Sequence, residues 1–170
     1  NLAGESDFNQ VFFDDVFVPD DCVIGEAGNG WAQVISELGY ERSGPERFLS
    51  SFLVIVEFIR EVGTHPSDEQ AALIGRLVAE LVALRRMSIS VAGMLEEGKT
   101  PSTEAALVKE LGNNFERVVP EAIRSLMPID ASERFLTTLN DTILHAPSFT
   151  LRGGTREILR GVIARGLGLR

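Results

Sequence analysis

Residues 67–98 read SDEQAALIGRLVAELVALRRMSISVAGMLEEG and predict one long amphipathic helix. Ser67 and Gln70 form a capping box, and Asp68 and Glu69 place negative charge in the first turn, where the helix dipole favours it. Gly98 is the stop signal. One face stays apolar through Leu73, Leu77, Leu81, Leu84, Val91 and Leu95. At about 1.5 Å per residue this helix is about 45 Å long, which suits a long helical bundle.

The segment before this helix predicts a second, interrupted helix. Apolar residues recur every three or four positions from Trp31 to about Val62. Pro45 lies inside this stretch. A proline has no N–H to donate, and its ring collides with the carbonyl four residues earlier, here that of Glu41. We therefore expect the helix to kink or restart at Pro45.

The segment after residue 98 predicts three more helices. Thr100 and Pro101 are expected to be the N-cap and first position of a helix that Pro128 ends. A shorter helix is expected over residues 132–145, and Thr155 is expected to cap a last one. Across the bundle, the residues expected in the core are Leu73, Leu77, Leu81, Leu111, Phe115, Phe52 and Val56.

The first thirty residues differ from the rest. Residues 8–13 and 16–18 are short stretches rich in Val and Phe, which predicts two short strands, or one strand and an extended arm. Pro19 ends this segment and glycines follow, so the boundary is placed near Gly30. The predicted fold is mostly α: an up-down four-helix bundle with a short β-type N-terminal arm.

The composition narrows the range of partners. The chain has 170 residues, 44% of them hydrophobic, enough for one globular domain. Its formal net charge of −9 disfavours nucleic acid and anionic membranes, and its apolar stretches are far shorter than the roughly 20 residues of a membrane helix. A single cysteine, Cys22, favours a reducing, cytoplasmic location. Residues 1–5, NLAGE, have the character of a cut within a longer chain.

Metal chemistry is not predicted. A di-iron site in a helical bundle needs Glu-x-x-His pairs, and neither His65 nor His145 has a glutamate three positions before it. We interpret His65 as a loop residue and His145 as a residue near a helix end.

Two segments are candidates for a functional site. Residues 151–158, LRGGTREI, place a double glycine directly before a capped helix, where free N–H groups and the helix dipole favour an anion or oxyanion. A plain turn into a helix is the alternative. The second segment is Tyr40-Glu41-Arg42, a carboxylate in a fairly apolar helix close to Pro45. Here the alternative is a solvated helix glutamate.

Both segments belong to a series of motifs that closely resembles the acyl-CoA dehydrogenases. The series comprises residues 12–19 (FFDDVFVP), Gly25-Glu26, residues 28–31 (GNGW), Glu41-Arg42, residues 153–160 (GGTREILR) and residues 166–169 (GLGL). The motifs follow the family's order across nearly the whole chain. The resemblance implies that residues 1–30 are the end of the family's middle β domain with a linker, and that residues 31–170 are the C-terminal helical bundle of a divergent, bacterial-type member.

The resemblance also implies a reaction and roles for residues. Family members use FAD to remove hydrogens from the α and β carbons of an acyl-CoA thioester, and a glutamate takes the α proton. In many members this glutamate stands at the position of Gly153, and in a smaller group at the position of Glu41. The resemblance therefore implies Glu41 as catalytic base and the Gly153 backbone N–H near the thioester oxygen. It places Gly154, Thr155 and Glu157 in the FAD site.

The implied partners are the acyl-CoA substrate, an electron-transfer flavoprotein as electron acceptor, and further subunits in a homotetramer or heterotetramer. Two segments depart from the family pattern. Residues 61–66, EVGTHP, replace Arg-x-x-Phe-Gly, and residues 125–130, SLMPID, replace Gln-x-x-Gly-Gly-x-Gly. In the family both segments contact the FAD of a neighbouring subunit. The alternative is therefore a non-catalytic partner subunit of a heteromeric acyl-CoA dehydrogenase that lacks a productive flavin site.

Overall fold

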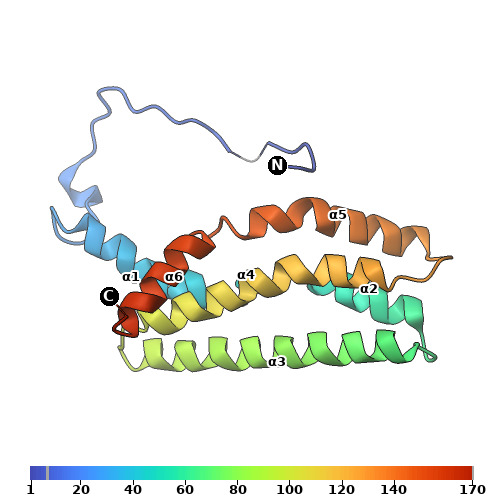
Figure 1. The fold of residues 1–170 in the computed structure, drawn as a ribbon. Coiled ribbons are helices and arrows are strands. Elements are labelled where there is room, and N and C mark those ends of the chain that lie inside the picture. Colours follow the sequence, from blue (N-terminus) through green and yellow to red (C-terminus); the bar gives the residue numbers. More distant parts are fainter. Residues whose placement is uncertain (7, 170) are drawn as a thin grey trace.

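Helix α4, Ser102–Ser125, is the central element of the fold, and the other helices pack around it (Figure 1). The computed structural model describes residues 1–6 and 8–169. In chain order the elements are the 3-10 turn η1 (Asp20–Cys22), α1 (Gly30–Ser43), the 3-10 turn η2 (Pro45–Arg47), α2 (Phe52–Val62), α3 (Asp68–Glu96), α4, α5 (Glu133–Phe149) and α6 (Arg156–Gly166).

The arrangement is the predicted up-down four-helix bundle. Helices α3, α4 and α5 run lengthwise, and α4 lies between the other two (Figure 1). Helix α2 packs on all three toward one end, and α1 packs on α3 and α4 toward the other. The split pair α1–α2 therefore acts as the fourth member of the bundle. Helix α6 packs against α4 at the same end as α1.

The predicted break at Pro45 is confirmed. Helix α1 ends at Ser43, Gly44 is extended with ψ 154°, and η2 follows at once. The chain enters α2 only at Phe52. Because Pro45 cannot donate to the Glu41 carbonyl, the first helix cannot continue through this point. The short passage between α1 and α2 brings η2, Ser50 and Ser51 back against α4.

The long helix is also confirmed. The Ser67 hydroxyl accepts from the Gln70 N–H at 3.2 Å, and the Gln70 side chain accepts from the Ser67 N–H at 2.9 Å. The helix runs 29 residues to Glu96, about 43 Å at 1.5 Å per residue. Gly98 follows with φ +73°, a conformation that glycine adopts without steric cost.

Two other helix ends differ from expectation. Helix α4 starts at Ser102 with Pro101 as its N-cap, not at Pro101 with Thr100 as its cap, because Pro101 has a non-helical ψ of 58°. Helix α5 continues to Phe149, beyond His145, and includes Pro147 in its last turn. A proline this close to the end forfeits one hydrogen bond without ending the helix. Thr155 is the N-cap of α6, as predicted.

The core prediction is right for the α3 stripe and wrong for two residues. Leu73, Leu77 and Phe115 are buried, whereas Phe52 and Leu111 are 44% and 43% exposed. Phe52 is the first residue of α2. Leu111 lies on the one face of α4 that the other helices leave open. Leu81 and Val56 are partly buried.

The N-terminal arm forms no strand in the part that the structure describes. It passes outside the bundle (Figure 1) and contains only η1. A strand needs a neighbouring strand to take its backbone hydrogen bonds, and no such neighbour is present among the described residues. The expected β-type arm is therefore corrected to an extended segment. Its aromatic side chains are largely exposed: Phe8, Phe12, Phe13 and Phe17.

Candidate functional site

The candidate base, Glu41, stands in the last turn of α1 and is held by Arg47 of η2. The Arg47 Nε donates to the Glu41 carbonyl oxygen at 2.8 Å, and a terminal guanidinium nitrogen donates to Glu41 Oε1 at 2.7 Å. The Arg47 side chain is buried, and that of Glu41 is about one third exposed. The carboxylate is thus fixed at the surface of the bundle by a buried cation.

The second candidate segment, between α5 and α6, meets Glu41 in space. Gly153 has φ +69°, and a Cβ built on it would lie 3.3 Å from Glu41 Oε1. Arg42 fastens this contact, because its Nε donates to the Gly153 carbonyl oxygen at 2.8 Å across 111 sequence positions. The structure therefore brings Glu41 and Gly153 together, with the glutamate occupying the side on which a residue at 153 would project.

The three predicted cofactor residues continue from this contact into α6. Gly154 has φ +110°, and a Cβ there would lie 3.6 Å from an Arg42 guanidinium nitrogen. Thr155 caps α6 and Glu157 is in its first turn. A hydrogen bond from its own backbone N–H, with a second from the Thr155 hydroxyl, lowers the pKa of Glu157. Gly154, Thr155 and Glu157 thus form the start of α6, with a positive φ at Gly154 and an exposed carboxylate in the first turn.

Behind Glu41 lies a largely buried polar cluster, which sequence reasoning missed. We name it the α4 polar cluster: Lys109, Asn113 and Glu116 of α4, with Arg152. The three α4 residues share one face of the helix and are fully buried. Their spacing of four and three residues was the signal in the sequence that could have revealed this face. The apolar residues Leu107, Leu111 and Val118 have a similar spacing on the opposite face of α4, and they indicated that the opposite face would be the buried one.

Glu116 is the anchor of the α4 polar cluster. Its Oε1 accepts from the Ser50 backbone N–H at 2.8 Å, and its Oε2 lies 3.3 Å from an Arg152 guanidinium nitrogen. The same Arg152 nitrogen donates to the Ser50 hydroxyl at 2.8 Å, and the guanidinium lies over the Phe149 ring. A single buried carboxylate thus joins α4, the segment before α2 and the segment before α6.

Lys109 carries the one large pKa change resolved in the described residues. Burial lowers the pKa of its ammonium to about 8; Glu116 opposes this, Arg152 and Arg47 add to it, and Glu41 opposes it. The ammonium donates to the Phe149 carbonyl oxygen at 3.1 Å. Burying a charged ammonium is costly, so Lys109 destabilises the folded state while it stays protonated.

This pKa gives a pH prediction. The unfolded chain keeps the Lys109 proton to about pH 10.5, whereas the folded chain releases it near pH 8, so the lysine's contribution to stability rises across that window. Lys109→Met removes the titration. We expect urea unfolding to show that the free energy of unfolding of the wild type rises relative to that of Lys109→Met between pH 7 and pH 10, by on the order of 1–3 kcal/mol. A difference that stays constant with pH contradicts the assignment.

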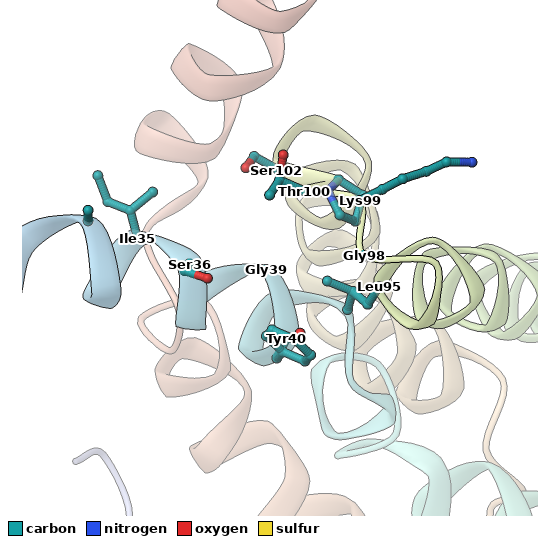
Figure 2. A pocket seen from close by; sticks show the side chains of 11 residues that line it. Ile35, Ser36, Gly39, Tyr40, Leu95, Gly98, Lys99, Thr100 and Ser102 are labelled. Atoms are coloured by element: carbon teal, nitrogen blue, oxygen red, sulfur yellow. The ribbon is translucent and has the colours of Figure 1, made fainter. Parts of the chain in front are cut away.

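Two hollows lie between α1 and neighbouring elements. A pocket of about 450 Å³ lies between α1 and the α3–α4 turn. Figure 2 shows Tyr40 of α1 and Leu95 of α3 lining it, while the Lys99 side chain extends away from it. A groove of about 520 Å³ lies between α1 and α6, with Trp31, Val34, Ile35, Leu38, Ile158, Val162, Arg42 and Arg165 in its wall. Arg42 joins this groove to the Glu41–Gly153 contact, because it lines one and bonds to the other.

The described residues contain no membrane-spanning helix and no metal-binding cluster. None of their helices is long and apolar enough to cross a bilayer. No three His, Cys, Asp or Glu side chains within residues 1–6 and 8–169 gather closely enough to hold a metal ion. His65 lies in the α2–α3 loop. His145 lies in the last part of α5, where its ring nitrogens are 2.8 Å from Glu5 Oε2 and 2.7 Å from the Asp141 carbonyl oxygen.

Comparison with known proteins gives consistent matches. The family model described as "Acyl-CoA dehydrogenase, C-terminal domain" matches residues 58–168. The chain is 28% identical to acyl-CoA dehydrogenase FadE34 of Mycobacterium tuberculosis over 98% of its own length and 23% of that protein's. It is 28% identical to acyl-CoA dehydrogenase IpdE1 of Mycolicibacterium smegmatis and 30% identical to its M. tuberculosis namesake, over 99% of the chain and 44% and 46% of those proteins. The chain thus spans less than half the length of each of these relatives.

Proposed function

The chain belongs to the acyl-CoA dehydrogenase family, and from this premise we propose that it is the C-terminal part of a flavin-dependent enzyme that dehydrogenates the α and β carbons of an acyl-CoA thioester. Under this proposal residues 31–170 are the helical domain and residues 1–30 are the end of the middle β domain. The exposed phenylalanines of the arm support the second assignment, because such side chains need another surface to cover them. A bacterial, cytoplasmic location is part of the proposal.

The observation that carries the proposal is the contact between Glu41 and Gly153. The position that holds the base in many relatives is a glycine here, and the Glu41 carboxylate stands where a side chain at 153 would project. Glu41 thus supplies a carboxylate at a site that would otherwise lack one. A general base must lie within reach of the proton that it takes, and the proposal is supported by the bond through which Arg47 holds the partly exposed Glu41 carboxylate at the surface of the bundle.

Under this proposal each residue of the site has a separate role in the reaction. Glu41 takes the α proton of the thioester, and the Gly153 N–H donates to the thioester oxygen, where negative charge develops. Gly153 and Gly154 both have a positive φ, which glycine adopts without steric cost, so they permit the turn that leads into α6. Gly154, Thr155 and Glu157 would lie against FAD, which, when bound, accepts the hydride from the β carbon.

A second candidate is a non-catalytic partner subunit. The two segments that depart from the family pattern lie at the same end of the bundle, in the α2–α3 and α4–α5 turns (Figure 1). They are fastened to neighbouring helices: Glu61 accepts from the Ser132 N–H at 2.7 Å, and Gln70 donates to the Leu126 carbonyl oxygen at 2.9 Å. These bonds favour a structural role for the two turns, whereas in the family the corresponding segments contact the FAD of a neighbouring subunit.

The proposed assembly is a homotetramer or heterotetramer that takes acyl-CoA as substrate and passes electrons to an electron-transfer flavoprotein. An exposed apolar stripe on α4 supports association, since Leu107, Leu111 and Val118 remain more than a third exposed on the central helix of the fold.

The test is anaerobic reduction of the flavin. The complete protein is purified alone, and also with the product of any neighbouring dehydrogenase-like gene, then mixed with a panel of acyl-CoA thioesters while the flavin absorbance is followed. We expect a yellow protein that at least one thioester bleaches. A protein that is colourless alone, and joins a yellow partner whose flavin is bleached, establishes the partner-subunit function instead.

A further inference from the structure

Arg47 is joined to both the main chain and the side chain of Glu41. The break at Pro45 leaves the Glu41 carbonyl without its helical donor. Arg47 Nε supplies a donor to that oxygen at 2.8 Å, and the same guanidinium reaches Glu41 Oε1 at 2.7 Å. A planar guanidinium offers donors in a fixed fork, so two bonds to one residue restrict both its backbone and its side-chain torsions.

Arg47 has its own supports, so it does not merely follow Glu41. Its backbone N–H donates to the Gly44 carbonyl oxygen at 3.1 Å, within η2. The next residue, Phe48, is 2% exposed and anchors the segment in the core. Helix α4 approaches so closely that a Cβ on Gly112 would lie 2.4 Å from the Arg47 carbonyl oxygen. The backbone of Arg47 is therefore held by contacts that do not depend on the bonds between its side chain and Glu41.

We propose that Arg47 is the positioning residue for Glu41: its guanidinium holds the carboxylate beside Gly153 through a bond to Oε1. This role rests on the proposed function, in which Glu41 is the base. It also gives the Pro45 break a purpose, because an uninterrupted α1 would satisfy the Glu41 carbonyl within the helix and would carry residue 47 away from the carboxylate.

The test uses the complete, flavin-containing protein and two variants. Arg47→Lys keeps a buried cation and most of the stem but cannot donate from two forked nitrogens. Arg47→Ala removes the group and leaves room for a guanidinium ion. Glu46→Gln is the matched control, since this carboxylate is 3.5 Å from Arg47 Nε and more than half exposed. The readouts are the crystallographic position of the Glu41 carboxylate, and the rate of flavin reduction at saturating acyl-CoA.

We expect the carboxylate to leave its wild-type position in both Arg47 variants. We expect the saturating rate to fall by roughly 10–100-fold, as for a reacting group misplaced by about 1 Å, with little change in the half-saturating acyl-CoA concentration. Added guanidinium chloride should restore part of the rate in Arg47→Ala, and Glu46→Gln should match the wild type. Rescue separates positioning from a general loss of structure.

The proposal is overturned if Glu41 keeps its position in Arg47→Lys and the rate stays within about twofold of Glu46→Gln. Failure of the proposed function has a different signature: the wild type itself reduces no flavin. The crystallographic comparison still decides the role of Arg47 in that case, because it does not depend on turnover.

Discussion

Glu41→Gln is expected to abolish reduction of the flavin by acyl-CoA while leaving the fold intact. Glutamine keeps the size of the side chain and can still accept from Arg47, but it cannot take a proton. No other carboxylate is placed beside Gly153 by the family's motifs. The rate should therefore fall by at least the roughly 10²–10⁴-fold that general acid–base catalysis contributes. Stopped-flow measurement of flavin absorbance under anaerobic conditions gives this rate.

Glu37→Gln is the matched control for this experiment. Glu37 lies one turn earlier on α1 and is exposed, so the same substitution there changes the charge of the helix equally without touching the site. It should reduce flavin at the wild-type rate. Equal rates in Glu41→Gln and the wild type would place the base elsewhere.

Glu116→Gln should cause the largest loss of stability among single substitutions in the α4 polar cluster. The carboxylate is fully buried and faces Ser50, Arg152 and the charge of Lys109. Removing its charge leaves the buried ammonium of Lys109 and the partly exposed guanidinium of Arg152 without their shared counter-charge. Leaving buried groups such as the Lys109 ammonium without this carboxylate costs about 1–3 kcal/mol per group, and more for charged groups, a large part of the roughly 5–15 kcal/mol that stabilises an ordinary domain.

Urea unfolding at pH 7 measures this loss, and Glu121→Gln on the same helix is the control. Glu121 forms an exposed pair with Arg124, and such pairs contribute about 0–1 kcal/mol. If the two variants unfold at the same urea concentration, the α4 polar cluster does not stabilise the fold. A lower midpoint for Glu116→Gln alone supports it.

Local signals predicted most helix ends correctly. The capping box at Ser67, the stop at Gly98 and the break at Pro45 are all formed by neighbouring residues, so a short window of sequence contains them. The arm at residues 8–18 was harder. Its Val and Phe content is typical of a strand, but a strand forms only when a partner strand is present.

The orientation of α4 could not be read from its own sequence. Leu107, Leu111 and Val118 form an apolar stripe of helical period, which an isolated amphipathic helix would bury. Helix α4 is instead enclosed by helices on most of its sides. Lys109, Asn113 and Glu116 become buried as a result, and the apolar stripe falls on the open side. Only the packing of the other helices decides this.

The sequence predicted only part of the candidate site, because the remaining contacts depend on how distant segments pack. The resemblance paired Glu41 with Gly153, and the structure places them together. The sequence also showed that Pro45 frees the Glu41 carbonyl. It did not show which group would bond to that oxygen, because Arg47 reaches it only after the chain turns back through η2.

Exchange of the α proton tests the central claim most directly. An acyl-CoA whose β carbon carries no hydrogen, such as phenylacetyl-CoA, can lose and regain its α proton but cannot be dehydrogenated. In D₂O with the complete, flavin-containing protein, we expect mass spectrometry to show deuterium entering the α carbon with wild type and with Glu37→Gln, but not with Glu41→Gln. Equal exchange in wild type and Glu41→Gln, or no exchange with the wild type, would contradict the assignment of Glu41 as the base.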